Sequence, residues 1–157
     1  DSDNTDADPE VLVAIGELST SIGAADITEV EMVTTTADKS EGFTISVRVR
    51  YNEPVDVVTT GGTPTLAVTN GNEGTGTGRG PHSLSYASGT GTNELIFSLA
   101  IAAANAATNA DDVLSVGAQT IALNSGTIKD ASGTASDAAL VISGAVGTAA
   151  GTVTVTA

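Results

Sequence analysis

The chain contains no cysteine and no tryptophan, and it has only two Phe and two Tyr in 157 residues. Without cysteine it can form neither a disulfide nor a thiolate metal site. With so few aromatic side chains, its hydrophobic core has to be built mainly from Val, Ile, Leu and Ala. Sugar sites usually need aromatic platforms, so a glycosidase built on paired carboxylates is not expected.

Basic residues are also scarce, because five Lys and Arg stand against 19 Asp and Glu and give a net charge of −14. Eleven of these acids lie in residues 1–41, where Lys39 is the only base. Such a surface repels phosphate backbones, so we expect no nucleic-acid partner. No apolar run is long enough for a transmembrane helix, and no signal-peptide pattern opens the sequence, so we expect no membrane span.

The clearest local pattern is a period-two alternation over residues 43–51. The side chains that share its apolar face are Phe43, Ile45, Val47, Val49 and Tyr51. Strict alternation of this kind predicts a half-buried β-strand with Arg48 and Arg50 on the solvent side. Pro54 lacks an N–H and restricts the residue before it, so we expect the strand to end at Glu53 and Pro54.

Shorter strands are predicted along the rest of the chain. Residues 63–68, 83–86 and 95–101 alternate or are rich in β-branched residues, and Asn70-Gly71 supplies a turn signal. Leu95, Phe97 and Leu99 should join the 43–49 face in the core. About seven to nine short strands, with turns about every 8 to 12 residues, are typical of a β-sandwich.

Five short motifs follow one another along the chain: YNEPV at 51–55, GTPTL at 62–66, YASGTGT at 86–92, ELIF at 94–97 and NSGTIKDASG at 124–133. In this order they resemble the motifs of the Ig-like repeats in large bacterial surface adhesins of the biofilm-associated and cadherin-like type. Related Ig-like modules decorate the capsids and fibres of tailed phages. The resemblance implies an all-β, Ig-like sandwich of about seven to nine short antiparallel strands with N- and C-terminal extensions.

On this basis we divide the chain into three parts. Residues 1–25 are expected to form an acidic N-terminal arm and residues 26–142 the Ig-like sandwich. Residues 143–157 are expected to form a C-terminal extension that contains a terminal strand.

The expected function is non-catalytic. The first hypothesis is a structural module on a virion surface, a capsid decoration or head-fibre protein that its terminal arms attach to a capsid or other surface-assembly subunit. The alternative is an extracellular adhesin repeat at the cell surface that mediates cell or matrix attachment. Either function is compatible with a chain that associates with copies of itself.

The predicted partner-binding residues are the apolar side chains of the arm together with one arginine. They are Val11, Leu12, Val13, Ile15, Leu18 and Arg79. An apolar run beside an acidic leader suggests a segment that lies on a partner, although an extra edge strand on its own sheet explains it equally well.

Metal and catalytic sites have weaker signals. Asp111, Asp112 and Asp130 are weak candidates for calcium, which the resemblance implies, but no EF-hand-type loop surrounds them, so we expect no bound metal or other cofactor. His82 is the only histidine, no nucleophile-elbow motif accompanies it, and a surface or turn position is expected. The Gly-rich segment at 74–80 lacks the Lys-Ser/Thr ending of a phosphate loop and is expected to be a hairpin tip.

Overall fold

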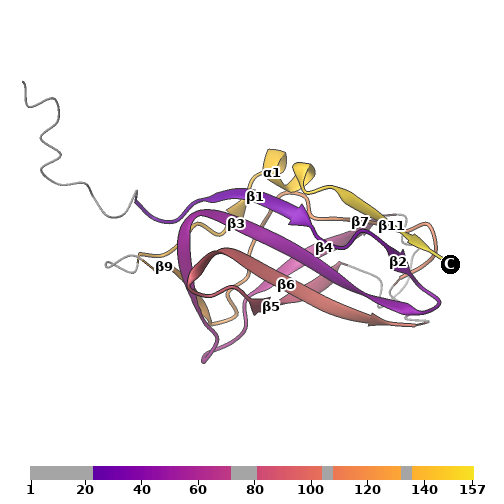
Figure 1. The fold of residues 1–157 in the computed structure, drawn as a ribbon, viewed down its shortest axis with the longest axis horizontal. Coiled ribbons are helices and arrows are strands. Elements are labelled where there is room, and N and C mark those ends of the chain that lie inside the picture. The colour runs from indigo at the N-terminus through magenta and orange to yellow at the C-terminus, as the bar shows by residue number, and fades with distance from the viewer. Residues whose placement is uncertain (1–22, 72–80, 104–107, 132–135) are drawn as a thin grey trace, which may run out of the picture.

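The computed structural model describes residues 23–71, 81–103, 108–131 and 136–157 (Figure 1). Strands hold 58% of these residues and helix 5%, so the protein is all-β, as the sequence predicts. The elements are β1 (Ile27–Met32), β2 (Ala37–Asp38), β3 (Gly42–Val58), β4 (Thr65–Gly71), β5 (His82–Ser88), β6 (Thr92–Ala102), β7 (Val113–Ser115), β8 (Gln119–Thr120), β9 (Thr127–Asp130), β10 (Val141–Ile142), α1 (Gly144–Ala149) and β11 (Thr152–Thr156).

Nine of the strands form one curled, mixed sheet in the order β1-β3-β6-β5-β4-β7-β11-β2, and β9 pairs with the second half of β3. The curl brings the half that contains β3 and β6 over the half that contains β4, β7 and β11, with the core between them (Figure 1). The small β8–β10 pair stands apart from this sheet. The strands were expected to be short and antiparallel, and both expectations were wrong in part. β11 and β2 run parallel, and β3 is 17 residues long.

The predicted register of the central strands is confirmed. Ile45, Val47, Val49, Leu95 and Phe97 are buried, whereas Arg48 and Arg50 lie on the outer face. The two remaining predicted core residues, Phe43 and Leu99, are only half-buried and pack against the core from one side. They lie near the Gly42–Ala102 end of the β3–β6 ladder.

The prediction that Pro54 ends its strand was wrong, because β3 continues to Val58. The β3–β6 ladder shifts register between Arg50 and Val55, and from Val55 onward β3 also pairs with β9. Proline is tolerated at such irregularities because no ladder hydrogen bond requires its missing N–H. The Pro54 carbonyl still accepts a hydrogen bond from Ala131 N–H at 3.0 Å.

The C-terminal segment contains the predicted strand and an unpredicted helix. β11 lies between β7 and β2, and Val153 and Val155 belong to the shared core. The Ser143 hydroxyl accepts a hydrogen bond from Val146 N–H at 3.3 Å and caps the start of α1. None of the helices in the described part of the chain is long and apolar enough to cross a membrane.

Candidate interaction surface

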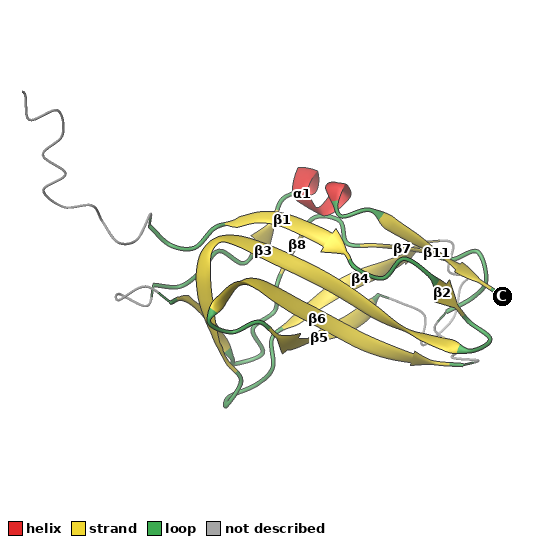
Figure 2. Cartoon of the chain, viewed as in Figure 1, coloured by secondary structure: helices red, strands yellow, loops and turns green. Residues whose placement is uncertain are grey.

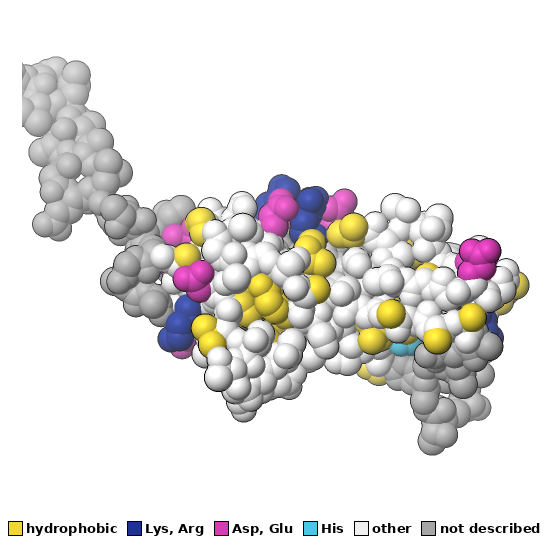
Figure 3. Space-filling model, turned by 60° about the horizontal axis from the view of Figure 1, so that its bottom comes forward, with side chains coloured by type: hydrophobic (Ala, Val, Ile, Leu, Met, Phe, Trp, Pro, Cys, Tyr) yellow, Lys and Arg dark blue, Asp and Glu magenta, His cyan; other side chains and the backbone are white. Residues whose placement is uncertain are grey.

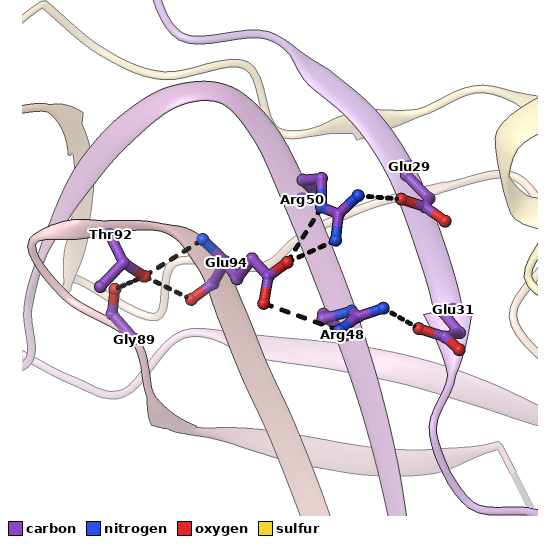
Figure 4. Close-up of polar contacts among 7 residues, drawn as sticks. All are labelled: Glu29, Glu31, Arg48, Arg50, Gly89, Thr92 and Glu94. Carbon is purple, nitrogen blue, oxygen red and sulfur yellow. Dashed lines mark hydrogen bonds and ion pairs between the residues drawn. The ribbon is translucent and has the colours of Figure 1, made fainter.

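An ordered group of charges lies on the outer face of β1, β3 and β6 (Figure 4). The sheet register places Arg50 between Glu29 on one side and Glu94 on the other. Arg50 Nη1 lies 2.9 Å from Glu29 Oε2, and Arg50 Nε donates a hydrogen bond to Glu94 Oε1 at 3.0 Å. Arg48 pairs with Glu31 and reaches Glu94 Oε2 at 3.6 Å. We call these five residues the charged ladder.

Mutual neutralisation explains the protonation properties of the ladder. The hydrogen bond from Arg50 lowers the pKa of Glu94, and the hydrogen bond to Glu94, with the nearby charge of Glu29, raises the pKa of Arg50. In space-filling view the positive and negative side chains gather in a compact group, whereas most of the surrounding surface is uncharged (Figure 3). The ladder therefore presents paired charge rather than a field of one sign.

Strand β1 is one edge of the sheet, and helix α1 lies beside it (Figure 2). Between them is a groove of about 480 Å³, which on the β1 side is lined by residues 28–31. On the α1 side the lining residues are Ala145, Val146 and Ala149. This groove is a more promising interaction site than the ladder, because it is hollow and its lining includes apolar side chains.

A second acidic group lies where β3 meets β9. Glu53 is only 9% exposed, and its Oε1 atom has no hydrogen-bond partner among the described residues. Burial, followed by repulsion from Asp130 and Asp26, raises the pKa of Glu53. The folded protein therefore favours the protonated form of Glu53 more strongly than the unfolded chain does.

This environment predicts how Glu53→Gln changes stability with pH. Because the folded-state pKa of Glu53 is raised, its ionisation destabilises the fold as pH rises from the ordinary value near 4.5 through the folded-state value. The uncharged glutamine avoids this loss. Urea denaturation at several pH values should show the stability of the variant relative to wild type increasing as the pH rises above about 4.5, and levelling off once Glu53 is ionised in the folded protein. A pH-independent difference would contradict this account.

The three metal candidates do not come together. Asp111 N–H donates to Val155 O near the end of β11, and the adjacent Asp112 accepts a hydrogen bond from Asn109 N–H. Asp130 instead pairs with Val55 at the opposite end of the molecule (Figure 1). Across the described ranges, no group of three or more His, Cys, Asp or Glu side chains is arranged to hold a metal ion.

We accordingly expect calcium and chelator to have little effect on stability. A ligand that binds only the folded state raises the melting temperature, and millimolar calcium would saturate even a weak site of the extracellular type. Differential scanning calorimetry with calcium or with chelator should give nearly the same melting temperature. An increase of several degrees with calcium would show that the Glu53 end of the molecule, or a segment outside the described residues, binds the ion.

The expectation of a surface or turn position for His82 was wrong. His82 begins β5 and is 5% exposed, and its Nε2 atom lies 3.2 Å from the Oγ1 atom of Thr108, which is fully buried. His82 and Leu84 share the inward face of the strand. The alternation that begins at Ser83 could have revealed this position if it had been extended by one residue.

The remaining predicted site residues lie outside the described part of the chain. These are Val11, Leu12, Val13, Ile15, Leu18 and Arg79, together with the Gly-rich segment 74–80. The groove between β1 and α1 was not predicted, because α1 itself was missed. No family model, curated protein or solved structure matches the chain.

Proposed function

We propose that the protein is an Ig-like β-sandwich. The strand order supports this architecture, since β1-β3-β6-β5 and β4-β7-β11 match the four- and three-stranded sheets of an Ig domain. In this interpretation the first strand of the Ig domain is divided into β1 and β2. β1 pairs with β3 in one sheet, and β2 pairs with β11 in the other. The β4–β5 pairing links the two sheets at one side.

We further propose a non-catalytic function: display on a particle surface, as a virion decoration or head-fibre module attached through its terminal segments. The observation that supports it most is the groove between β1 and α1, whose partly apolar lining is suited to protein binding. The acidic surface favours solubility and disfavours nucleic acid. The only histidine is buried against Thr108, which leaves it poorly placed to act on a substrate.

The alternative function, an adhesin repeat that holds cells or matrix, is favoured by one specific observation. The buried Glu53 carboxylate beside Asp26 and Asp130 would be relieved by a cation, and adhesins of the resembled type often bind calcium. The calorimetric comparison with and without calcium therefore separates the two candidates.

Removal of residues 1–22 tests the attachment role of the arm while it retains every described residue, including the fully buried Ala25. The full chain should co-sediment with virions from its source, and the shortened chain should stay in the supernatant with unchanged circular dichroism and melting temperature. Binding at full strength after the deletion would refute attachment through the arm. If the shortened chain instead failed to fold, the arm would have to be part of the molecule's own β-sheet.

A further inference from the structure

We propose that the groove between β1 and α1 binds a lysine-bearing, extended segment of the partner protein. The inference deepens the proposed function, because it rests on the groove being a protein-binding surface and identifies the chemistry of the segment that binds there. The contact is made by side chains and needs no free backbone group on β1, whose edge is hydrogen-bonded to the 139–150 segment at Ala25 and Met32.

The two walls of the groove differ in chemistry. On the α1 side, Ala145 and Ala149 are exposed and lie one helical turn apart, and Val146 is half-buried beside them. On the β1 side the groove is lined by residues 28–31, which include the two carboxylates of Glu29 and Glu31. An apolar wall of small side chains therefore stands beside an acidic wall.

The charges of the ladder do not cancel. Three carboxylates stand against two guanidinium groups, so one negative charge is left over. Glu94 receives both arginines, because Arg50 bonds to it through two nitrogen atoms and Arg48 Nη1 lies 3.6 Å from its Oε2 atom. Glu29 and Glu31 each contact one arginine that is shared with Glu94. The remaining negative charge therefore lies mainly on β1, beside the groove.

Each carboxylate on β1 has room for a further cation. Within the described part of the chain, Arg50 contacts the Oε2 atom of Glu29, and Arg48 contacts the Oε2 atom of Glu31. The second oxygen of each carboxylate points away from the arginines (Figure 4). The two glutamate side chains are 48% and 46% exposed. A cation from a partner can therefore approach them without displacing the existing ion pairs.

A lysine side chain fits this arrangement better than an arginine side chain does. Its aliphatic stem can lie against Ala145 and Ala149 while its ammonium group stays in water at the acidic wall. An ammonium group is a compact charge that a single carboxylate oxygen can bind, whereas a guanidinium group binds best to both oxygens at once. In Glu29 and Glu31 one of the two oxygens is already bound to arginine.

The spacing of the carboxylates sets the spacing of the lysines. Glu29 and Glu31 lie two residues apart on one strand, which corresponds to roughly 7 Å. Lysines at positions i and i+2 of an extended segment have the same separation and point to the same side. Adjacent lysines point to opposite sides, so only one of them could reach the groove. The groove should therefore favour a Lys-X-Lys segment.

Titration of the full, isotope-labelled chain with the capped peptide GKAKG, followed by NMR chemical shifts, tests the proposal. We expect saturable shifts at residues 28–31 and 145–149 that weaken with added salt, because salt screens exposed charges. The peptides GKKAG and GRARG carry the same charge and should bind about threefold more weakly or less well still. Residues 1–22 hold six acids and no base and also attract cations. Shifts confined to residues 1–22, or equal binding of the three peptides, would overturn the proposal.

Two pairs of variants separate the groove from net charge. Ala149→Arg places a cation in the groove and should weaken GKAKG binding by about tenfold or more. Thr148→Arg adds the same charge at an exposed position of α1 outside the lining and should weaken it much less. Glu31→Gln should likewise weaken binding more than Glu41→Gln, which removes an exposed acid outside the groove. Equal effects within each pair would mean that net charge alone attracts the peptide.

Co-sedimentation with virions distinguishes failure of this inference from failure of the proposed function. We expect Ala149→Arg to abolish co-sedimentation and Thr148→Arg to retain it, both with unchanged melting temperature. If Ala149→Arg abolishes co-sedimentation but GKAKG does not bind the groove, the groove takes a segment of different chemistry, so this inference fails while the proposed function stands. If the wild-type chain does not co-sediment at all, the proposed function fails even where the peptide binds.

Discussion

Replacing Phe97 with alanine should lower the free energy of unfolding by about 3 to 5 kcal/mol, the usual cost of removing a large buried aromatic side chain. Phe97 is fully buried on β6, and its ring contacts Tyr86 edge-to-face with centroids 6.1 Å apart. The chain has only two Phe, two Tyr and no Trp, so few large rings are available to fill the space. The surrounding Val and Leu side chains are held by two opposed strand ladders and cannot collapse fully into the cavity.

Urea denaturation of Phe97→Ala and of Ile96→Ala measures this effect. Ile96 is the preceding residue of the same strand but is only half-buried on the opposite face, so its truncation should cost much less. Similar costs for the two variants would mean that the inner and outer faces of β6 do not differ as described. The slope of the transition should be unchanged, because neither variant alters the surface exposed on unfolding by much.

Gly62→Ala should also be strongly destabilising, by about 3 kcal/mol, near the upper end of the usual cost of overpacking. A Cβ atom at this position would lie 1.7 Å from the carbonyl oxygen of Asn124, which is far inside contact distance. The obstacle is backbone and cannot rotate away. The Asn124 side chain also holds the two segments together, since its amide donates hydrogen bonds to Thr63 O at 2.9 Å and to Thr65 Oγ1 at 3.0 Å.

Gly144→Ala is the matched control for this loss. At Gly144, in the first turn of α1, a Cβ atom would meet only the Ala118 Cβ atom at 4.0 Å, an ordinary contact. The substitution should leave stability unchanged or raise it by up to about 1 kcal/mol, because it reduces the freedom of the unfolded chain. Thermal unfolding should therefore show a clearly lower melting temperature for Gly62→Ala and an equal or higher one for Gly144→Ala. A Gly62→Ala protein as stable as wild type would exclude the close approach of the backbone at residues 62 and 124.

The sequence was sufficient to predict the strands in which one face is buried. In β3 and β6 the alternation of apolar and polar residues sets the register, because a slip of one residue would turn every apolar side chain toward water. The same alternation placed Arg48 and Arg50 on the outer face of β3. It could not show that these charges would be paired, because pairing depends on which strands become neighbours.

The features that sequence did not reveal depend on contacts between distant segments. Helix α1 contains Gly144 and Gly147, which disfavour a helix locally. A Cβ atom at Gly147 would lie 2.1 Å from Gly117 O, so a glycine is needed there for close packing rather than for helix formation. The groove between β1 and α1 could not be predicted for the same reason, since one of its walls is this helix.

The parallel pairing of β2 with β11 has a mechanical consequence. Ala37 pairs with Val155 and Asp38 with Thr156, and Lys39 N–H donates to Thr156 O at 3.0 Å. The described chain starts at one end of the long axis, and β11 finishes at the other (Figure 2). Tension between these points pulls the two strands past each other, so the hydrogen bonds that join them share the load and must yield together rather than one after another. A module held at both ends would therefore resist extension more strongly than the number of these bonds alone suggests.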